Sequence, residues 1–242
     1  MRLSKIEIGW ERPLCHDQVL ALVRREGMDF PQARKAAAER YGREWSLRLY
    51  ATTQCVTNLV QGIAGPIENG LFRRLSFVCA PEDAWEGVSV GPAGCGTVLV
   101  RHDPWPLLLE KDDLRRKRMA GDILGAGIEV LARTEPRFDA GPLRGALNAA
   151  RGIDFENVRL WKRLRSESGK TAEVLVRQDT KSYRAELTVT TRKGLVLNRQ
   201  TIAEGGPSTT YIHERHLGSM RWEGESLVVE AESGFRFELD VG

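Results

Sequence analysis

The chain has 242 residues, of which 41% are hydrophobic and 29% charged, and its formal net charge is +3 at pH 7. These values are ordinary for a soluble globular protein and leave room for one large domain or two small ones. The charge is too small to indicate nucleic-acid binding by itself, because duplex-binding domains concentrate their basic residues in one stripe.

Helices and strands are both predicted before residue 102. One helix covers Asp17–Glu26 and ends at Gly27, and a second starts at Asp29-Phe30-Pro31 and ends at Gly42. Strands are expected where β-branched and aromatic residues gather. Their ranges are Leu3–Ile8, most of Trp45–Val60, Leu71–Cys79, and a hairpin of Glu86–Val90 and Thr97–Arg101 around Gly91–Gly96.

Helical spacing returns after Asp103-Pro104-Trp105-Pro106. Between Leu107 and about Arg133, apolar side chains recur at i, i+4 and i+7, at Leu124, Ile128 and Leu131. Gly121, Gly125 and Gly127 argue against a single unbroken helix there. Pro136 ends the segment, and a further short helix is predicted over Pro142–Arg151.

From Val158 onward the sequence predicts antiparallel strands. Within Tyr183–Thr190 every second residue is apolar, which places one strand face in a core and the other in solvent. Short turns separate the expected strands, which are Val158–Leu164, Thr171–Arg177, Tyr183–Thr190, Leu195–Ile202, Thr209–Leu217, Leu227–Ala231 and Phe235–Val241.

These elements predict an α+β fold, in which an antiparallel β-meander in the C-terminal half packs with helices from the N-terminal and central segments. No linker-like stretch divides the chain, so a single domain of residues 1–242 is preferred. The alternative is a mixed α/β lobe of residues 1–152 and an antiparallel sheet of residues 153–242.

The sequence also predicts a cytoplasmic protein with reduced thiols and no contact with a membrane. Met1–Lys5 is followed by charged residues rather than by the apolar run of a signal peptide, and no stretch approaches the ~20 apolar residues of a membrane span. The four cysteines are widely spaced and form no C-x-x-C motif, which excludes a disulfide scaffold; they are Cys15, Cys55, Cys79 and Cys95.

Ser166–Thr171 contains the Gly-Lys-Thr ending of a phosphate-binding loop but lacks the rest of the motif. The motif needs a glycine five residues before Gly169, where this chain has Leu164. It also needs a helix after the threonine, to direct backbone N–H groups at the phosphate, whereas the following Val174-Leu175-Val176 is typical of a strand. The segment therefore predicts a hairpin turn.

No complete catalytic or metal-binding set is present, and no cofactor is predicted. Cys95 and His102 would form a thiolate–imidazole pair only if the predicted hairpin brought them together. His213 and His216 are three residues apart in an expected strand and would point to opposite faces, so no metal site is predicted there.

Two basic clusters are the candidate binding residues. The first lies on the predicted central helix, and its members are Arg115, Arg116, Lys117 and Arg118. The second surrounds Trp161 and contains Arg159, Arg163 and Arg165, with Arg159, Trp161 and Arg163 expected on one strand face and Lys162 on the other. Arginine pairs carboxylates bidentately, and basic residues beside an aromatic ring can also hold nucleic acid. A solvated helix face with local Asp–Arg pairs is the alternative for the first cluster, and a mixed sheet edge is the alternative for the second.

These observations favour a non-catalytic protein that binds another protein with an acidic surface. Arginine greatly outnumbers lysine, which is typical of a GC-rich genome, so a bacterial immunity protein that neutralises a toxin is one concrete form. Two alternatives stay open. One is a hydrolase or transferase that uses Cys95 and His102, and the other is a nucleic-acid-binding module that uses Arg115–Arg118.

The incomplete phosphate-binding motif yields a direct prediction. Calorimetry with ATP or GTP and magnesium is expected to give no heat of binding at millimolar nucleotide, because Leu164 replaces the loop glycine and a strand follows Thr171. A micromolar affinity that Lys170→Ala abolishes would contradict this expectation.

Overall fold

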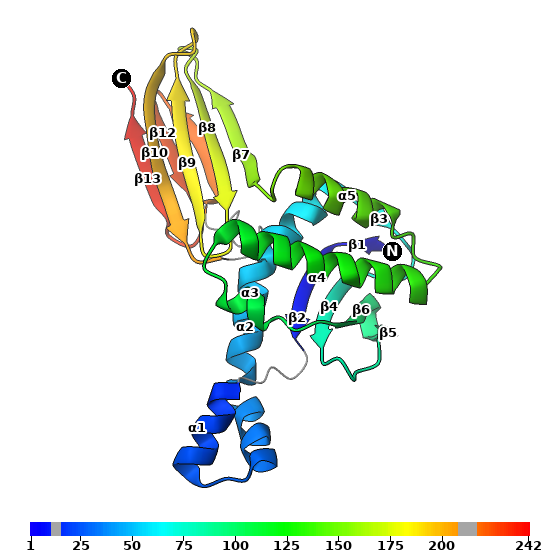
Figure 1. Cartoon of the computed structure of the whole chain (residues 1–242). Coiled ribbons are helices and arrows are strands. Elements are labelled where there is room, and N and C mark those ends of the chain that lie inside the picture. The colour runs from blue at the N-terminus through cyan, green and yellow to red at the C-terminus, as the bar shows by residue number, and fades with distance from the viewer. Residues whose placement is uncertain (11–15, 208–216) are drawn as a thin grey trace. The chain divides into compact units, whose positions relative to one another are not determined.

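The computed structural model describes residues 1–10, 16–207 and 217–242, and divides the chain into two compact units (Figure 1). Unit 1 is Met1–Phe155 and unit 2 is Glu156–Gly242. This division lies within three residues of the alternative boundary at Gly152. The preferred single domain of residues 1–242 stays a prediction.

Unit 1 combines helices with a mixed sheet. Its elements are β1 (Arg2–Leu3), β2 (Lys5–Trp10), α1 (His16–Glu26), α2 (Phe30–Ala64), β3 (Ile67–Glu68), β4 (Arg74–Ala80), β5 (Gly87–Val90), the 3-10 turn η1 (Pro92–Gly94), β6 (Cys95–Arg101), α3 (Trp105–Leu109), α4 (Asp113–Thr134) and α5 (Gly141–Gly152). The main sheet has the order β2-β4-β6-β5. Strands β2, β4 and β6 are parallel, and β5 forms the predicted hairpin with β6.

The strand predicted over Trp45–Val60 is wrong, because α2 continues through this segment and does not end at Gly42. Its buried Leu49, Thr53, Val56 and Val60 recur at i, i+4, i+7 and i+11, so the helical period outweighs the strand propensity of the threonines and valines. The Thr53 hydroxyl donates to the Leu49 carbonyl at 2.9 Å, which satisfies this buried polar group within the helix.

Helix α4 is unbroken despite its three glycines, and it packs closely on the sheet (Figure 1). A methyl group on Gly127 would overlap the ring of Phe77 in β4, and one on Gly121 would overlap the ring of Phe155. The glycines therefore permit the helix to approach its neighbours closely, and the helix continues through all three of them. The expected segment from Leu107 is divided, because α3 ends at Leu109 and Asp112 caps α4 by accepting a bond from the Arg115 N–H at 2.8 Å.

Unit 2 consists of two antiparallel sheets around one apolar core. The sheets have the orders β10-β9-β8-β7 and β11-β12-β13. Their strands are β7 (Asn157–Arg165), β8 (Thr171–Gln178), β9 (Tyr183–Thr190), β10 (Val196–Gly205), β11 (Ser219–Glu223), β12 (Ser226–Glu230) and β13 (Arg236–Asp240). Side chains of both sheets share the core, among them Val174, Leu187, Met220 and Leu227.

The predicted α+β class with a C-terminal antiparallel meander is confirmed. The alternation in Tyr183–Thr190 is confirmed as well, since β9 has these bounds and buries every second residue. Strand β11 was not predicted, and most of the strand expected at Thr209–Leu217 lies outside the described residues.

Two glycine substitutions test the close approach of α4. Gly127→Ala is expected to lower the free energy of unfolding, because overpacking against Phe77 costs about 1–3 kcal/mol and exceeds the ~1 kcal/mol gained in helix propensity. Chemical denaturation measures both variants. Gly145→Ala in α5 is the matched control, because no atom lies within 4 Å of the added methyl, and it is expected to stabilise by up to about 1 kcal/mol. Equal effects of the two changes would contradict the tight contact.

Candidate functional site

The first basic cluster begins α4, and most of its members are engaged in local bonds. Arg116 donates to the carbonyl of Glu110. Lys117 is only 13% exposed and pairs with Asp113 at 2.8 Å, and Arg118 pairs with Asp154 at 2.8 Å. Arg115 is 72% exposed, and its guanidinium lies 3.9 Å from the carboxylate of Glu110. The cluster is therefore mainly a set of local pairs, and Arg115 is its most accessible cation.

The second basic cluster is split between the two faces of β7 by a β-bulge at Trp161. Leu160 pairs with Leu175 and Lys162 pairs with Val174, so Trp161 has no partner of its own in β8. The expected shared face of Arg159, Trp161 and Arg163 is therefore wrong. Before the bulge Arg159 lies beside the core residue Val176, whereas after it Arg163 and Arg165 lie on the outer face. Arg163 pairs there with Glu173 at 2.6 Å.

Cys95 and His102 do not form a reactive pair. Cys95 begins β6 and His102 follows its last residue, so they are about 23 Å apart at the ~3.3 Å rise of a strand. The phosphate-loop ending forms the predicted hairpin turn, since Gly169 has a φ of 87° between β7 and β8. Lys170 binds Glu225 at 2.7 Å in this turn.

Other chemistry is sparse in the part of the chain that the structure describes. No group of three or more His, Cys, Asp and Glu side chains there could hold a metal ion. His213 and His216 lie outside the described residues. No described helix has the length and apolar character needed to cross a bilayer. Burial raises the pKa of the Cys79 thiol to about 12, with a smaller contribution from Asp103, so this thiol is not a nucleophile near neutral pH.

The open face of the unit 1 sheet is the candidate site that the sequence did not reveal. One face of the sheet is buried, and α4 packs on it through Phe77 of β4. On the opposite face, Ser76, Val78, Thr97 and Leu99 are only half-buried, and Ser89 is exposed. We call this second surface the open sheet face. It is unusual because mostly parallel sheets are generally covered on both faces.

A carboxylate with several partners lies on the edge strand β2 of the open sheet face. Glu7 accepts bonds from Arg74 Nε at 2.9 Å and from Ser76 Oγ at 2.7 Å, and Lys5 Nζ lies 3.1 Å from it. Lys5 also donates to the Tyr50 hydroxyl of α2 at 2.7 Å. Partial burial raises the pKa of Glu7, but the bonds from Ser76, Arg74 and Lys5 together hold that pKa below its ordinary value. The group is thus an ionised anchor and is unsuited to act as a general acid.

Helix α2 forms a wall beside the open sheet face. A hollow of about 430 Å³ lies between them, with Gly9, Val78 and Thr97 on its floor and Arg43 and Leu47 on the α2 side. Leu47 is 58% exposed. On the far side of the sheet face, the indole of Trp85, which is 62% exposed, lies where a Gly87 side chain would project. The face is therefore a trough with an apolar wall on each side.

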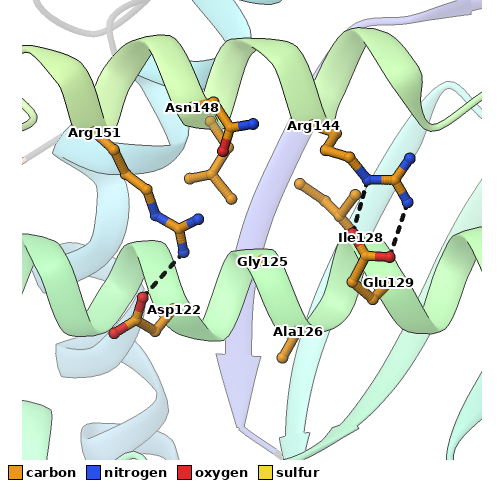
Figure 2. A pocket seen from close by; sticks show the side chains of 9 residues that line it. Asp122, Gly125, Ala126, Ile128, Glu129, Arg144, Asn148 and Arg151 are labelled. Atoms are coloured by element: carbon orange, nitrogen blue, oxygen red, sulfur yellow. Dashed lines mark hydrogen bonds and ion pairs between the residues drawn. The ribbon is translucent and has the colours of Figure 1, made fainter.

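A second hollow lies between α4 and α5, and Figure 2 shows ion pairs across it at two points. Arg151 binds Asp122 at 3.0 Å, and Arg144 binds Glu129 at 2.8 Å. Each arginine of α5 is thus balanced by a carboxylate of α4. This hollow is a crevice between packed helices, and its charges are already paired, so it is the weaker candidate.

Comparison with known proteins gives no functional information. Known protein families, curated proteins and solved structures yield no match to this chain.

The Glu7 network gives a prediction with a defined pH dependence. Because the pKa of Glu7 is lower in the folded state, the network stabilises the fold above the unfolded pKa of about 4.3, and this contribution is lost as the pH falls through the folded-state value. Glu7→Gln is expected to lower the free energy of unfolding at pH 7 by about 1–3 kcal/mol, and by less below about pH 4. Denaturant titrations at several pH values measure this difference.

Asp122→Asn serves as the control, because the Asp122–Arg151 pair is exposed and worth at most about 1 kcal/mol. A Glu7→Gln effect that is no larger than that of the control, or that stays constant from pH 7 to 3, would contradict the assignment.

Proposed function

We propose that this chain is a non-catalytic protein that binds another protein through the open sheet face of unit 1. The observation that carries the proposal is a sheet of three parallel strands and one antiparallel strand whose second face is only half-buried. The described residues leave this face only half-buried, which is a reason to expect a partner, since parallel strands normally bury both faces.

The chemistry of the trough resembles that of protein interfaces. Such interfaces combine an apolar centre with aromatic and arginine side chains, and exclude unpaired charges from their middle. Here Val78 and Leu99 lie between Leu47 and Trp85, and the one nearly buried carboxylate, Glu7, is neutralised by Arg74 and Lys5. The enzyme alternative loses its support because Cys95 and His102 lie at opposite ends of β6.

The partner in this proposal has an acidic contact surface, and the setting of the chain is the cytoplasm. A bacterial toxin neutralised by an immunity protein is one concrete form of the pair, supported by the arginine-rich composition and the lack of a complete catalytic motif. Sequestering a toxin needs only a stable interface, so a chain without catalytic groups is sufficient for it.

Leu47→Ala tests the proposed surface with a matched control. A partner captured from a lysate of the source cells is expected to bind Leu47→Ala at least about 1 kcal/mol more weakly, and Trp85→Ala about 2 kcal/mol or roughly 30-fold more weakly. Surface plasmon resonance measures both. Leu195→Ala in unit 2 removes a leucine of similar exposure, 67%, and is expected to change Kd less than twofold. Equal effects of the two leucine changes would refute the surface.

Arg115→Glu tests the sequence-based binding residues separately. If the Arg115–Arg118 cluster contacts the partner, this reversal is expected to slow association, since rim charges act mainly on the association rate. The fold is expected to stay intact because Arg115 is exposed. Arg116→Glu is a poorer choice, because that side chain holds the Glu110 carbonyl. An unchanged association rate would leave the cluster as a solvated helix face. Random duplex binding that is lost in Arg115→Glu and falls steeply with salt would instead favour nucleic acid.

A further inference from the structure

The register of the parallel strands orders the open sheet face into three rows. Residues paired across neighbouring strands share a face, so each row can be followed through β2, β4 and β6, and two of the rows continue into β5. The basic row is Lys5 and Arg74, followed by Cys95. The middle row is Glu7, Ser76, Thr97 and Ser89. The apolar row is Gly9, Val78, Leu99 and Gly87.

The apolar row has space for an element of one helix width. Gly9 leaves the outer position on β2 open, and Val78 and Leu99 project from the two central strands, whereas the Trp85 indole fills the space above Gly87 on β5. Because Trp85 covers the β5 position, the open floor between Trp85 and Leu47 consists of β2, β4 and β6, which span about 10 Å at a spacing of ~4.8 Å. An α-helix with side chains is about 10–12 Å wide. A second sheet would need a wider and flatter apolar surface than a trough with walls.

The charges at one end of the trough select an acidic occupant. Lys5 and Arg74 give the basic row two positive charges. Glu7 pairs with both side chains but carries only one negative charge, so one positive charge is left in excess. Arg43 adds a further cation on the α2 side of the hollow. An excess of positive charge beside an apolar floor disfavours a basic partner and attracts carboxylates, which arginine binds bidentately.

We infer that the occupant of the open sheet face is an acidic amphipathic α-helix of the partner protein. Its apolar stripe covers Val78 and Leu99, and its carboxylates reach the basic row. This helix supplies the missing second helical layer of the sheet. The inference rests on the proposed function and adds the structure and charge of the partner element.

Selection from a display library tests the inference with the full chain as bait. One library carries a helical-hairpin scaffold randomised on one helix face, and a matched library of equal size carries randomised extended loops. The helical library is expected to yield binders with an apolar stripe flanked by more Asp and Glu than Lys and Arg. Leu47→Glu and Ser89→Glu each add a negative charge at an exposed position and should weaken these binders at least about tenfold.

Leu195→Glu is the matched control in unit 2 and should leave the affinities unchanged. The inference is overturned if the helical library yields no binder, if its binders are basic or neutral, if only extended loops bind, or if neither trough variant weakens binding. A dimer of the chain in sedimentation velocity that Ser89→Glu dissociates would overturn it in favour of a second copy. If Leu47→Ala abolishes capture of the cellular partner but acidic helices do not bind the chain, this inference alone is refuted. If Leu47→Ala leaves capture of the cellular partner unchanged, the proposed function is refuted instead.

Discussion

The close contact between α4 and the sheet is the constraint on which unit 1 depends. Gly127 lets the helix backbone approach Phe77, and the apolar side chains of β2, β4 and β6 on that side are buried in one core. Because this core provides the apolar burial that stabilises the unit, the second face of the sheet is free to carry polar and charged groups. The asymmetry between the two faces is thus the basis of both stability and the proposed binding.

The charged groups of the open sheet face are paired with one another. A nearly buried carboxylate costs free energy unless its oxygens are bonded, and Glu7 receives bonds from a serine, an arginine and a lysine. These bonds also fix Arg74 in place before any partner arrives. A cation held in this way loses less side-chain entropy on binding than a free arginine would, which favours its use at an interface.

The sequence predicted local structure well where the period of the pattern matched a single element. Strand β9, the β5–β6 hairpin and the turn at Gly169 were all predicted from alternation or turn residues. After Gly42 the residue types of α2 favour a strand, whereas the spacing of Leu49, Val56 and Val60 is that of the helix which the structure shows. The parallel pairing of Lys5 with Arg74 joins residues 69 positions apart, and no local pattern encodes it. The open sheet face could therefore not be predicted.

The single bulged residue in β7 likewise places Arg159 and Arg163 on opposite faces, since one extra residue exchanges every later side chain between the faces. The Arg115–Arg118 cluster was visible in the sequence, but its bonds to Glu110, Asp113 and Asp154 depend on how α4 begins and where α5 ends.

Helix α2 joins two separate apolar clusters along its length of about 52 Å, at 1.5 Å for each of its 35 residues. Its C-terminal half belongs to the main core, whereas its first turns pack with α1 in a small cluster of Val19, Leu22, Ala33 and Ala37. Because this cluster is small, it buries little apolar surface. The α1 end can therefore open while the rest of unit 1 stays folded. Amide hydrogens in α1 would then exchange with solvent far faster than those around Val56, and a protease would cut the loop between α1 and α2 before it cut the helix around Val56.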